Sequence, residues 1–409
     1  MKCLKTIIFI GTNKSGSSRE AIKAAEMLGY FTVLFTNKER QIEQRHLYVD
    51  VHEMIFIDTT NVPAMKNEII SLQSKGNEIM TIVSFIDAHV ATALKLCKEF
   101  CPNDLSSIAA EVMENKAQTR ILLDGLPCSP KFTTVKPGEH VDAKVIDTFN
   151  GFPLIVKSSS STGSKDVLRA SDIDQLHQHI TKLHEKDPED HVIIEEFIEG
   201  DQYLVEAIIY NKEIHIAGII EQEITYGKRF IITGYGVLAT VPRPLSEGIE
   251  EVLKSIIDKF SITHAALHLE MRLSNNKWRL IEINPRISGG AMNKMLHAAF
   301  GYNLAEETLK LYLGEKPVLE QKQSNFIFTQ YVIVDKKGIL ERVTGKNRAR
   351  KIEGVVEVYV KPKKGTLLVP PLSMGHRYAY VIARGRTMSS AKVIAKRAAK
   401  ELQFHLIET

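Results

Sequence analysis

Residues 268–286 carry the residue types that bind metals and anions. Two runs that alternate apolar and polar residues flank residues 274–277, whose composition is typical of a turn, so the segment predicts a β-hairpin. We expect a register that pairs Glu270 with Glu282. Because side chains alternate between the two faces of a strand, one face then carries His268, Glu270, Glu282 and Asn284, and the other carries Leu267, Leu269, Met271, Ile281 and Ile283.

The opposed carboxylates of this hairpin predict a metal site. Like charges that face each other across a sheet are destabilising, and a divalent cation would offset them. Two carboxylates and an amide oxygen, completed by substrate phosphates, are a usual ligand set for Mg²⁺, so Glu270, Glu282 and Asn284 are candidate ligands. The alternative is a solvated face on which Arg272 or Lys277 compensates the charge. A slip of one residue in register would move every side chain to the other face.

The turn after the hairpin predicts an anion site. Arg286 can bind an anion with two hydrogen bonds, and the adjacent Gly289 and Gly290 let the backbone approach a ligand closely. An amphipathic helix follows, and its first turn offers free N–H groups and the positive end of a dipole. The alternative is a tight turn with a surface arginine.

A serine-rich run predicts a phosphate-binding loop. Residues 152–157 form a short apolar strand that ends in Lys157, and residues 158–165 read Ser-Ser-Ser-Ser-Thr-Gly-Ser-Lys before an extended pattern resumes at Val167. Small hydroxyl residues and a glycine can wrap a polyphosphate with backbone N–H groups. A flexible linker is the alternative, but the short run between two strands favours a hairpin loop. A further strand at 192–197 ends in acidic residues, and its edge could bind adenine through backbone groups.

The periodicity of apolar residues predicts the strands and helices that position these motifs. The first hundred residues alternate strands with helices, which predicts a doubly wound parallel sheet. Gly11 and Gly16 have the spacing of a P-loop, but Ser17 and Ser18 stand where Lys-Ser or Lys-Thr is required, so we read a strand-to-helix turn, with a small ligand at the sheet edge as the alternative. Predicted strands are 7–10, 31–35, 54–57, 80–83, 131–135, 154–157, 192–197, 203–210, 214–221, 229–233, 326–334, 355–360 and 377–384. Predicted helices are 18–28, 64–73, 88–100, 105–125, 172–185, 248–260 and 389–402.

Composition excludes several classes of protein. The 409 residues are 44% apolar and 25% charged, with a net charge of +4, which is too weak and too mixed to indicate a nucleic acid or an anionic membrane as partner. The first apolar run, 7–10, is too short for a signal peptide, and no run of about 20 apolar residues occurs. Cys3, Cys97, Cys101 and Cys128 form no CxxC pair, which favours buried free thiols. We expect a soluble cytoplasmic protein.

In this order, the motifs resemble those of the ATP-grasp superfamily. The resemblance rests on Asn115-Lys116, Pro-Leu-Ile-Val-Lys at 153–157, Ser-Ser-Thr-Gly-Ser at 160–164, Ile-Glu-Glu-Phe-Ile-Glu-Gly at 194–200, Leu-His-Leu-Glu-Met at 267–271 and Ile-Glu-Ile-Asn-Pro-Arg-Ile-Ser-Gly-Gly at 281–290. It implies an α/β and α+β chain with four regions: an N-terminal α/β domain at 1–104, linker helices and the small ATP-grasp lobe at 105–190, the large lobe at 191–318, and a C-terminal domain at 319–409.

The resemblance also implies roles for site residues. ATP would contact Lys116, Lys157, Ser161, Thr162, Gly163, Ser164, Glu195, Glu196, Phe197 and Ile198. Glu270 and Glu282, assisted by Asn284, would bind Mg²⁺, as two ions that Mn²⁺ could replace. Arg286 and Gly289 would serve catalysis, and with Gly290 they would hold the acyl phosphate and the substrate carboxylate. Catalysis of this kind is mainly positioning and charge neutralisation.

Within the superfamily the chain looks like the bacterial L-amino acid ligases, dipeptide synthetases akin to the bacilysin-pathway enzyme. That likeness implies two amino acids as small-molecule partners, a homodimer, and substrate contacts from Asp87 and Tyr235. Ile232 and Tyr235 stand where relatives often have an acidic residue and a histidine, so we expect a less polar pocket, an apolar first substrate and a small second one. The alternatives are another ATP-grasp ligase, of the biotin carboxylase or purine-pathway type, and a non-enzymatic ATP-binding module. The paired carboxylates argue against the last.

Overall fold

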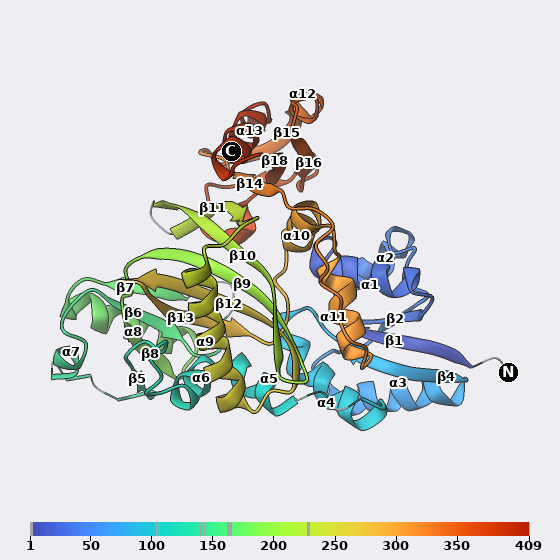
Figure 1. Cartoon of the computed structure of the whole chain (residues 1–409), viewed down its shortest axis with the longest axis horizontal. Helices are drawn as coiled ribbons and strands as arrows, with labels where there is room; N and C mark the ends of the chain where they lie inside the picture. Colours follow the sequence, from blue (N-terminus) through green and yellow to red (C-terminus); the bar gives the residue numbers. More distant parts are fainter. Residues whose placement is uncertain are drawn as a thin grey trace.

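The computed structural model describes residues 3–103, 105, 107–139, 141–142, 144–161, 166–226 and 230–408. Within these residues the strands form four sheets, arranged as an N-terminal sheet on one side, a small sheet on the other, a large sheet between them, and a C-terminal unit above the large sheet (Figure 1). This arrangement confirms the predicted fold class, because a parallel N-terminal sheet precedes a two-lobed middle part and a small C-terminal unit.

The N-terminal sheet is parallel, as predicted, in the order β3-β2-β1-β4. Its apolar strands are buried on both faces under helices, which is typical of parallel sheets. The elements are β1 (Leu4–Ile10), α1 (Ser17–Met27), β2 (Phe31–Thr36), α2 (Glu39–Glu43), β3 (Glu53–Phe56), α3 (Val62–Ser74), β4 (Asn77–Val83) and α4 (Val90–Phe100). The helix predicted from Ser18 begins one residue earlier, at Ser17. The N-cap is Gly16, and the Ser18 hydroxyl accepts from the Asn13 N–H instead (3.1 Å).

Two helices, rather than one, connect the N-terminal sheet to the rest of the chain. The predicted helix 105–125 is divided into α5 (Ser107–Glu114) and α6 (Lys116–Leu122). Asn115 separates them, because its side chain accepts from the Gln118 N–H (3.0 Å) and so caps α6. The cap makes Lys116 the first residue of α6, where its side chain can reach the small sheet.

The small sheet is antiparallel and has the order β5-β8-β6-β7. The pairing of β6 with β7 confirms the predicted hairpin around the serine-rich run. β8 lies beyond the boundary expected at 190 but pairs with β5 and β6, so we propose that the small lobe extends through Glu196. The elements are β5 (Phe132–Val135), α7 (Lys144–Thr148), β6 (Leu154–Ser158), β7 (Val167–Ala170), α8 (Ile173–Lys186) and β8 (Val192–Glu196).

The large sheet runs without a break into the C-terminal unit, in the order β13-β12-β9-β10-β11-β14-β18-β16. Its middle part comprises β9 (Asp201–Tyr210), β10 (Glu213–Tyr226), β11 (Phe230–Val237), α9 (Arg243–Phe260), β12 (His264–Ser274), β13 (Lys277–Asn284), α10 (Met292–Phe300) and α11 (Leu304–Tyr312). The C-terminal unit comprises β14 (Phe326–Val332), β15 (Gly338–Thr344), α12 (Lys346–Arg350), β16 (Val355–Val360), β17 (Leu367–Leu368), β18 (Ala379–Gly385), α13 (Met388–Lys400) and β19 (Gln403–Ile407). The separate sheet β17-β15-β19 was not predicted. The boundary at 318 stays a proposal.

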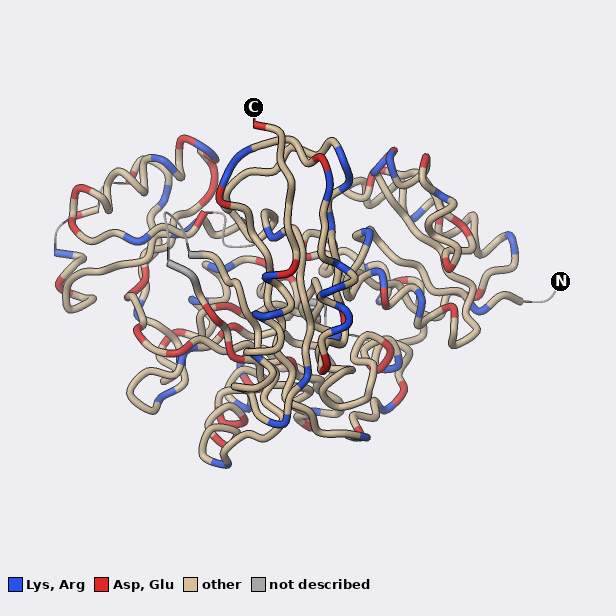
Figure 2. Tube along the Cα trace, turned by 90° about the horizontal axis from the view of Figure 1, so that it is seen from above, with Lys and Arg blue, Asp and Glu red and all other residues tan. Residues whose placement is uncertain are grey.

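The mixed distribution of charged residues and the free state of the cysteines agree with what the composition predicts. Lys and Arg alternate with Asp and Glu over the whole trace (Figure 2). All four cysteines are free thiols; Cys97 and Cys128 are buried, Cys101 is half-buried, and Cys3 is exposed, which corrects the expectation for that residue. Among the helices that the structure describes, none is long and apolar enough to cross a membrane.

The N-terminal sheet contacts the turn that follows β13. The Ser17 hydroxyl donates to the Ser288 carbonyl (2.6 Å), and the Asn293 amide donates to Glu20 (2.6 Å). Gly16 has a φ of +90°, and a Cβ at this position would stand 2.7 Å from the Gly290 carbonyl oxygen. The glycine turn with P-loop spacing is therefore the place where α1 packs against the predicted anion site.

We expect Gly16→Ala to be more harmful than Gly29→Ala. Both glycines have a positive φ (+90° and +86°), and Gly16 combines it with a ψ of −170°, a conformation that is almost restricted to glycine, so each substitution adds strain of about 1–3 kcal/mol. Only Gly16 also meets a backbone, because nothing lies within 4 Å of a Cβ at Gly29. Thermal unfolding should show a larger loss of stability in Gly16→Ala than in Gly29→Ala, and turnover should fall only in Gly16→Ala. Equal turnover in the two variants would contradict a tight contact between α1 and Gly290.

Candidate active site

A cleft of about 610 Å³ lies between the small sheet and the large sheet. The predicted residues Lys116, Lys157, Glu270 and Glu282, and the segment 195–198, all line it. Sequence analysis missed several walls of the cleft, which come from other parts of the chain: Arg169, His179, Lys182, Gln202, Ile224, Arg272, Leu372, Ser373 and Met374. Residues 372–374 belong to the C-terminal unit, so three regions of the chain meet at this cleft.

The hairpin β12–β13 has the predicted register at its polar end. His268 pairs with Asn284, Leu269 with Ile283, and Glu270 with Glu282. A bulge then shifts the register, so that Met271 faces Leu280 and not Ile281 as expected. An extra residue of this kind re-aims its side chain. Ile281 is consequently not a core residue but a wall of the cleft beside Glu282.

The two carboxylates lie in an environment that suits a hard cation. Glu270 accepts from the Gln202 amide (3.2 Å), while Glu282 accepts from the Asn284 amide (3.4 Å) and has the Lys116 Nζ at 3.7 Å. Burial and then the neighbouring Glu282 raise the pKa of Glu270. In the described chain no group of three or more His, Cys, Asp or Glu side chains could hold a metal. Two carboxylates with an amide fit Mg²⁺ that shares its remaining positions with phosphates.

A buried ion cluster stands under the phosphate end of the cleft. The Glu195 carboxylate receives the Lys157 Nζ (2.8 Å) and the Arg120 Nε (2.6 Å), and all three side chains are buried. Arg120 also donates to the Ile281 carbonyl (2.6 Å). The Glu195 side chain is thus fully engaged by cations, so its part in binding adenine is limited to its backbone. Nothing in the sequence around Arg120 indicated its role, because its partners come from distant strands.

Burial and charge give Lys157 an unusual titration. Burial lowers the pKa of Lys157 to about 8, although the Glu195 carboxylate acts in the opposite direction. Burial would raise the pKa of Glu195, but the charges of Arg120 and Lys157 outweigh it and hold that pKa below its ordinary value. The ammonium of Lys157 is therefore present at neutral pH but is lost more readily than that of a surface lysine.

Asp190 organises the serine-rich run. Its carboxylate accepts from the hydroxyls of Ser158 (2.5 Å), Ser159 and Ser160 (3.0 Å). Burial would raise the pKa of Asp190, but these three hydroxyls outweigh it and lower the pKa. Lys116 donates to the Ser161 carbonyl (2.6 Å) and so links the run to Glu282. The predicted ATP contacts Thr162, Gly163 and Ser164 lie outside the described residues.

The side chains of Glu196 and Phe197, at the end of β8, each contact different partners. Glu196 accepts from the Lys131 N–H (2.7 Å) and is ion-paired with Arg279. The guanidinium groups of Arg169 and Arg272 lie over the Phe197 ring, 4.8 Å and 5.3 Å from its centroid. Because β8 lies between β5 and β6, residues 195 and 196 belong to the ladder, and the expected free strand edge is confined to Phe197 and Ile198, which line the cleft beyond the end of β8.

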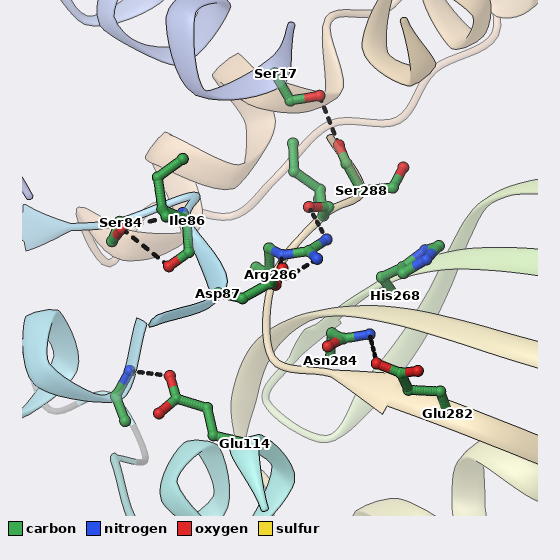
Figure 3. A network of polar contacts seen from close by, with 12 residues as sticks. Ser17, Ser84, Ile86, Asp87, Glu114, His268, Glu282, Asn284, Arg286 and Ser288 are labelled. Carbon is green, nitrogen blue, oxygen red and sulfur yellow. Dashed lines mark hydrogen bonds and ion pairs between the residues drawn. The ribbon is translucent and has the colours of Figure 1, made fainter. Parts of the chain in front are cut away.

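Arg286 and Asp87 form an ion pair at the far end of the site, below the contact between Ser17 and Ser288 (Figure 3). The turn behind Arg286 is fixed by the buried Glu206, which accepts from the Ser288 N–H (3.0 Å) and contacts the His268 Nδ1 (2.7 Å). Burial would lower the pKa of His268, but the Glu206 carboxylate outweighs it and raises that pKa.

Two glycines and two carboxylates complete this end. Gly289 and Gly290 are exposed, and Gly290 has a φ of +66°. Glu114, which sequence analysis missed, lies near Asp87 and accepts from the Ala91 N–H (2.8 Å) (Figure 3). Burial raises the pKa of Glu114, and Asp87 adds to this effect.

Tyr235 lies apart from Arg286. Its ring packs edge-on to Tyr331 with the centroids 5.7 Å apart, and the Tyr331 hydroxyl is 3.9 Å from the position of a Cβ on Gly290. Tyr235 therefore packs against Tyr331, and it is the Tyr331 hydroxyl that lies next to the Gly290 turn. Its role in binding substrate stays a prediction.

Comparison with known proteins bears on this geometry. An ATP-grasp domain matches residues 150–294, and the L-amino acid ligase C-terminal domain 2 matches residues 330–406. An uncharacterized protein of Sinorhizobium fredii, y4rH, is 27% identical over 366 residues, which are 87% of this chain and 74% of that one. The L-arginine-specific L-amino acid ligase of Bacillus subtilis is 23% identical over 324 residues, 78% of each chain. The crystal structure of L-amino acid ligase from Bacillus licheniformis has a TM-score of 0.83 over 100% of both chains, at 17% identity.

Residues 150–294 therefore match an ATP-grasp domain, and the chain as a whole has the fold of a solved L-amino acid ligase. The chain resembles the bacterial L-amino acid ligases in particular, since its C-terminal part matches their C-terminal domain 2 and its whole fold is similar to theirs.

Nucleotide affinity should fall as the pH rises through about 8. Because Lys157 has a pKa of about 8 in the folded chain and an ordinary value of 10.5, it loses its charge over a range in which an unfolded chain keeps it. Between pH 8 and 10.5 the folded state then binds fewer protons than the unfolded state, so this residue increases the free energy of unfolding as the pH rises. Over the same range the phosphates lose a cation that would bind them. Calorimetric titration with ADP from pH 7 to 9.5 should show the fall in the natural chain and a flat, weak profile in Lys157→Met. An equal fall in both would contradict the role of Lys157.

Asp190→Asn should weaken ATP binding without unfolding the small sheet. Loss of the charge that three serine hydroxyls share should loosen the serine-rich run and raise the KM for ATP about 10-fold, with a smaller effect on kcat. Glu189→Gln, an exposed neighbour that loses the same charge, is the matched control. Identical KM values for the two variants would show that Asp190 does not organise the loop.

Proposed function

We propose that this chain is an ATP-dependent carboxylate–amine ligase that joins two L-amino acids into a dipeptide through an acyl phosphate, releasing ADP and phosphate. The observation that supports this proposal best is the order of the charged groups. The charged groups follow one order from the small sheet to the Gly289–Gly290 turn. Lys157 and the serine-rich run come first, then Glu270 with Glu282, and then Arg286. That order matches the path of a phosphoryl group from a nucleotide to a carboxylate.

The nucleotide would occupy the cleft between the sheets. Its adenine would contact the backbone at 195–198, and its phosphates would contact Lys116, Lys157 and the run that begins at Ser158. The Glu195 carboxylate keeps the Lys157 ammonium in place, and Asp190 keeps the serine hydroxyls in place. Because the Lys157 ammonium and the serine hydroxyls are held in place before the nucleotide arrives, little reorganisation is needed when the phosphoryl group moves.

Glu270, Glu282 and the Asn284 amide would hold Mg²⁺. When bound there, Mg²⁺ would neutralise negative charge on the transferred phosphoryl group. The raised pKa of Glu270 fits this role, since burial and Glu282 together leave one carboxylate in need of a cation. The Lys116 ammonium, 3.7 Å from Glu282, would help to align the phosphates with the carboxylates.

The acid substrate would be activated beside Arg286. Its carboxylate oxygen attacks the γ-phosphorus, and the bond from that phosphorus to the β-phosphate oxygen breaks, which gives the acyl phosphate and ADP. The amine of the second substrate then attacks the acyl carbon, phosphate leaves, and the nitrogen gives up a proton. Arg286 and the N–H groups of the Gly289–Gly290 turn would stabilise the oxyanion. Asp87, with Glu114 nearby, would receive a substrate ammonium.

The alternative to dipeptide synthesis is another reaction of the ATP-grasp ligases. A different ATP-grasp ligase, of the carboxylase or purine-pathway type, would use the same cleft, because the match at 150–294 does not distinguish these reactions. The match at 330–406 favours the amino acid ligase. The homodimer and the cytoplasmic location stay predictions.

A phosphate-release screen over pairs of the twenty amino acids, with ATP and Mg²⁺, tests the function. We expect release that requires two amino acids and yields a dipeptide detectable by mass spectrometry. Release that needs bicarbonate instead would favour a carboxylase.

In the same screen Glu282→Gln should lower turnover by at least about 100-fold, because one carboxylate of the metal pair is lost. The fold should persist, since the glutamine amide can still bond to Asn284. Glu247→Gln, at an exposed position of α9, is the control. Ordinary turnover in Glu282→Gln would refute the metal site.

A further inference from the structure

Arg377 lies at the inner side of the C-terminal unit, stacked on aromatic rings. Its guanidinium carbon is 3.9 Å from the centroid of Tyr331 and 5.6 Å from that of Tyr235. Nη1 donates to the Ile232 carbonyl (3.3 Å) and contacts the Tyr235 hydroxyl (3.4 Å), and Nε donates to the Met374 carbonyl (3.2 Å). The side chain is half-buried, so the guanidinium is fixed in place but still reachable.

No carboxylate of the described chain forms an ion pair with Arg377. Two acidic residues of this region have partners of their own: Glu357 is held by Lys294 (2.7 Å) and the Tyr380 hydroxyl (3.2 Å), and Asp87 is held by Arg286. A second cation, Lys361, is close enough that burial and then Arg377 lower the pKa of Lys361. Its ammonium is bonded to the Gly375 carbonyl (3.0 Å). The neighbourhood thus holds two cations and lacks a resident counter-charge.

The position of Arg377 connects the two ends of the candidate site. Ile232 and Met374, whose carbonyls it binds, line the nucleotide cleft. Tyr331, on which it stacks, directs its hydroxyl toward Gly290 at the acyl-transfer end. Arg377 is therefore placed beside the space that a substrate of the Gly289–Gly290 turn would occupy.

A purely structural arginine would satisfy its donors within the protein. Here Nε and Nη1 are bonded, but Nη2 donates to no residue that the structure describes. A guanidinium that two tyrosine rings hold in place, with Nη2 open, can donate a charge-assisted hydrogen bond to a carboxylate oxygen. Stacking contributes to holding the cation but does not neutralise it.

We propose that Arg377 binds a second carboxylate of the substrate, so that the ligase selects an amino acid with an acidic side chain. This inference rests on the proposed function and adds the substrate class to it. It also replaces the expectation of an apolar first substrate. That expectation took account of Ile232 and Tyr235 but not of an arginine that reaches them from the C-terminal unit.

The test compares L-glutamate and L-aspartate with their neutral amides. The natural chain should have a kcat/KM about 10- to 100-fold higher for the acidic amino acids than for L-glutamine and L-asparagine. Arg377→Met should remove this preference by lowering the values for the acids alone, and Arg377→Lys should retain part of it. Arg386→Met, which removes an exposed arginine of the same unit, should change nothing.

Three results would overturn the proposal: no preference for acids in the natural chain, an equal loss for acids and amides in Arg377→Met, or a preference for O-phospho-L-serine over L-glutamate. The second of these would assign Arg377 to packing, and the third would assign it to a phosphate. If Arg377→Met does not fold, Arg377→Lys decides, since an unchanged acid preference in a variant without the planar fork would also refute the assignment.

A binding experiment separates this inference from the proposed function. If no pair of amino acids is turned over, the ligase proposal fails, yet the site can still be probed with ADP and Mg²⁺ present. Glutarate should then raise the thermal unfolding temperature more than butyrate does, and Arg377→Met should abolish that difference while Arg386→Met keeps it. Equal effects of glutarate and butyrate on the natural chain would refute a carboxylate site at Arg377.

Discussion

The buried carboxylate of Glu195 is the interaction on which the site depends. It holds Lys157 of β6 and Arg120 of α6, and Arg120 in turn donates to the carbonyl of Ile281 in β13. One side chain therefore connects the linker helices, the small sheet and the large sheet at the phosphate end of the cleft. Removing Glu195 would leave two buried cations without compensation, which is among the most costly changes a protein can undergo.

The charges of the site are arranged for a reaction that moves negative charge. Cations stand at both ends of the cleft, and the carboxylate pair Glu270 and Glu282 stands between them. Each cation is fixed by an acidic partner, Glu195 for Lys157 and Asp87 for Arg286. Arg377 differs, since its surroundings are carbonyls and tyrosines. Because no acidic residue of the described chain pairs with Arg377, its charge remains to contribute to substrate choice.

Much of the site could be predicted from sequence because its signals are local. A register assumed around the turn at 274–277 placed Glu270 opposite Glu282, as the structure confirms, and the serine-rich run between two strands indicated a hairpin loop. What could not be predicted depends on distant partners or on single backbone events. The bulge after Glu270 moved Ile281 from the core to the cleft, the cap at Asn115 divided one helix into two, and Arg120 and Arg377 acquire their roles only from strands that lie far away in sequence.

The hydrogen-bonded pairing of β11 with β14 has a consequence for motion. Because the large sheet continues through this pair into the C-terminal unit, that unit cannot swing away without breaking a ladder of backbone bonds. Among the residues that the structure describes, the small sheet shares no such ladder with the large one. A movement that opens the cleft would therefore have to displace the small sheet, which side-chain contacts such as Arg120–Glu195 join to its surroundings, rather than the C-terminal unit that supplies residues 372–374.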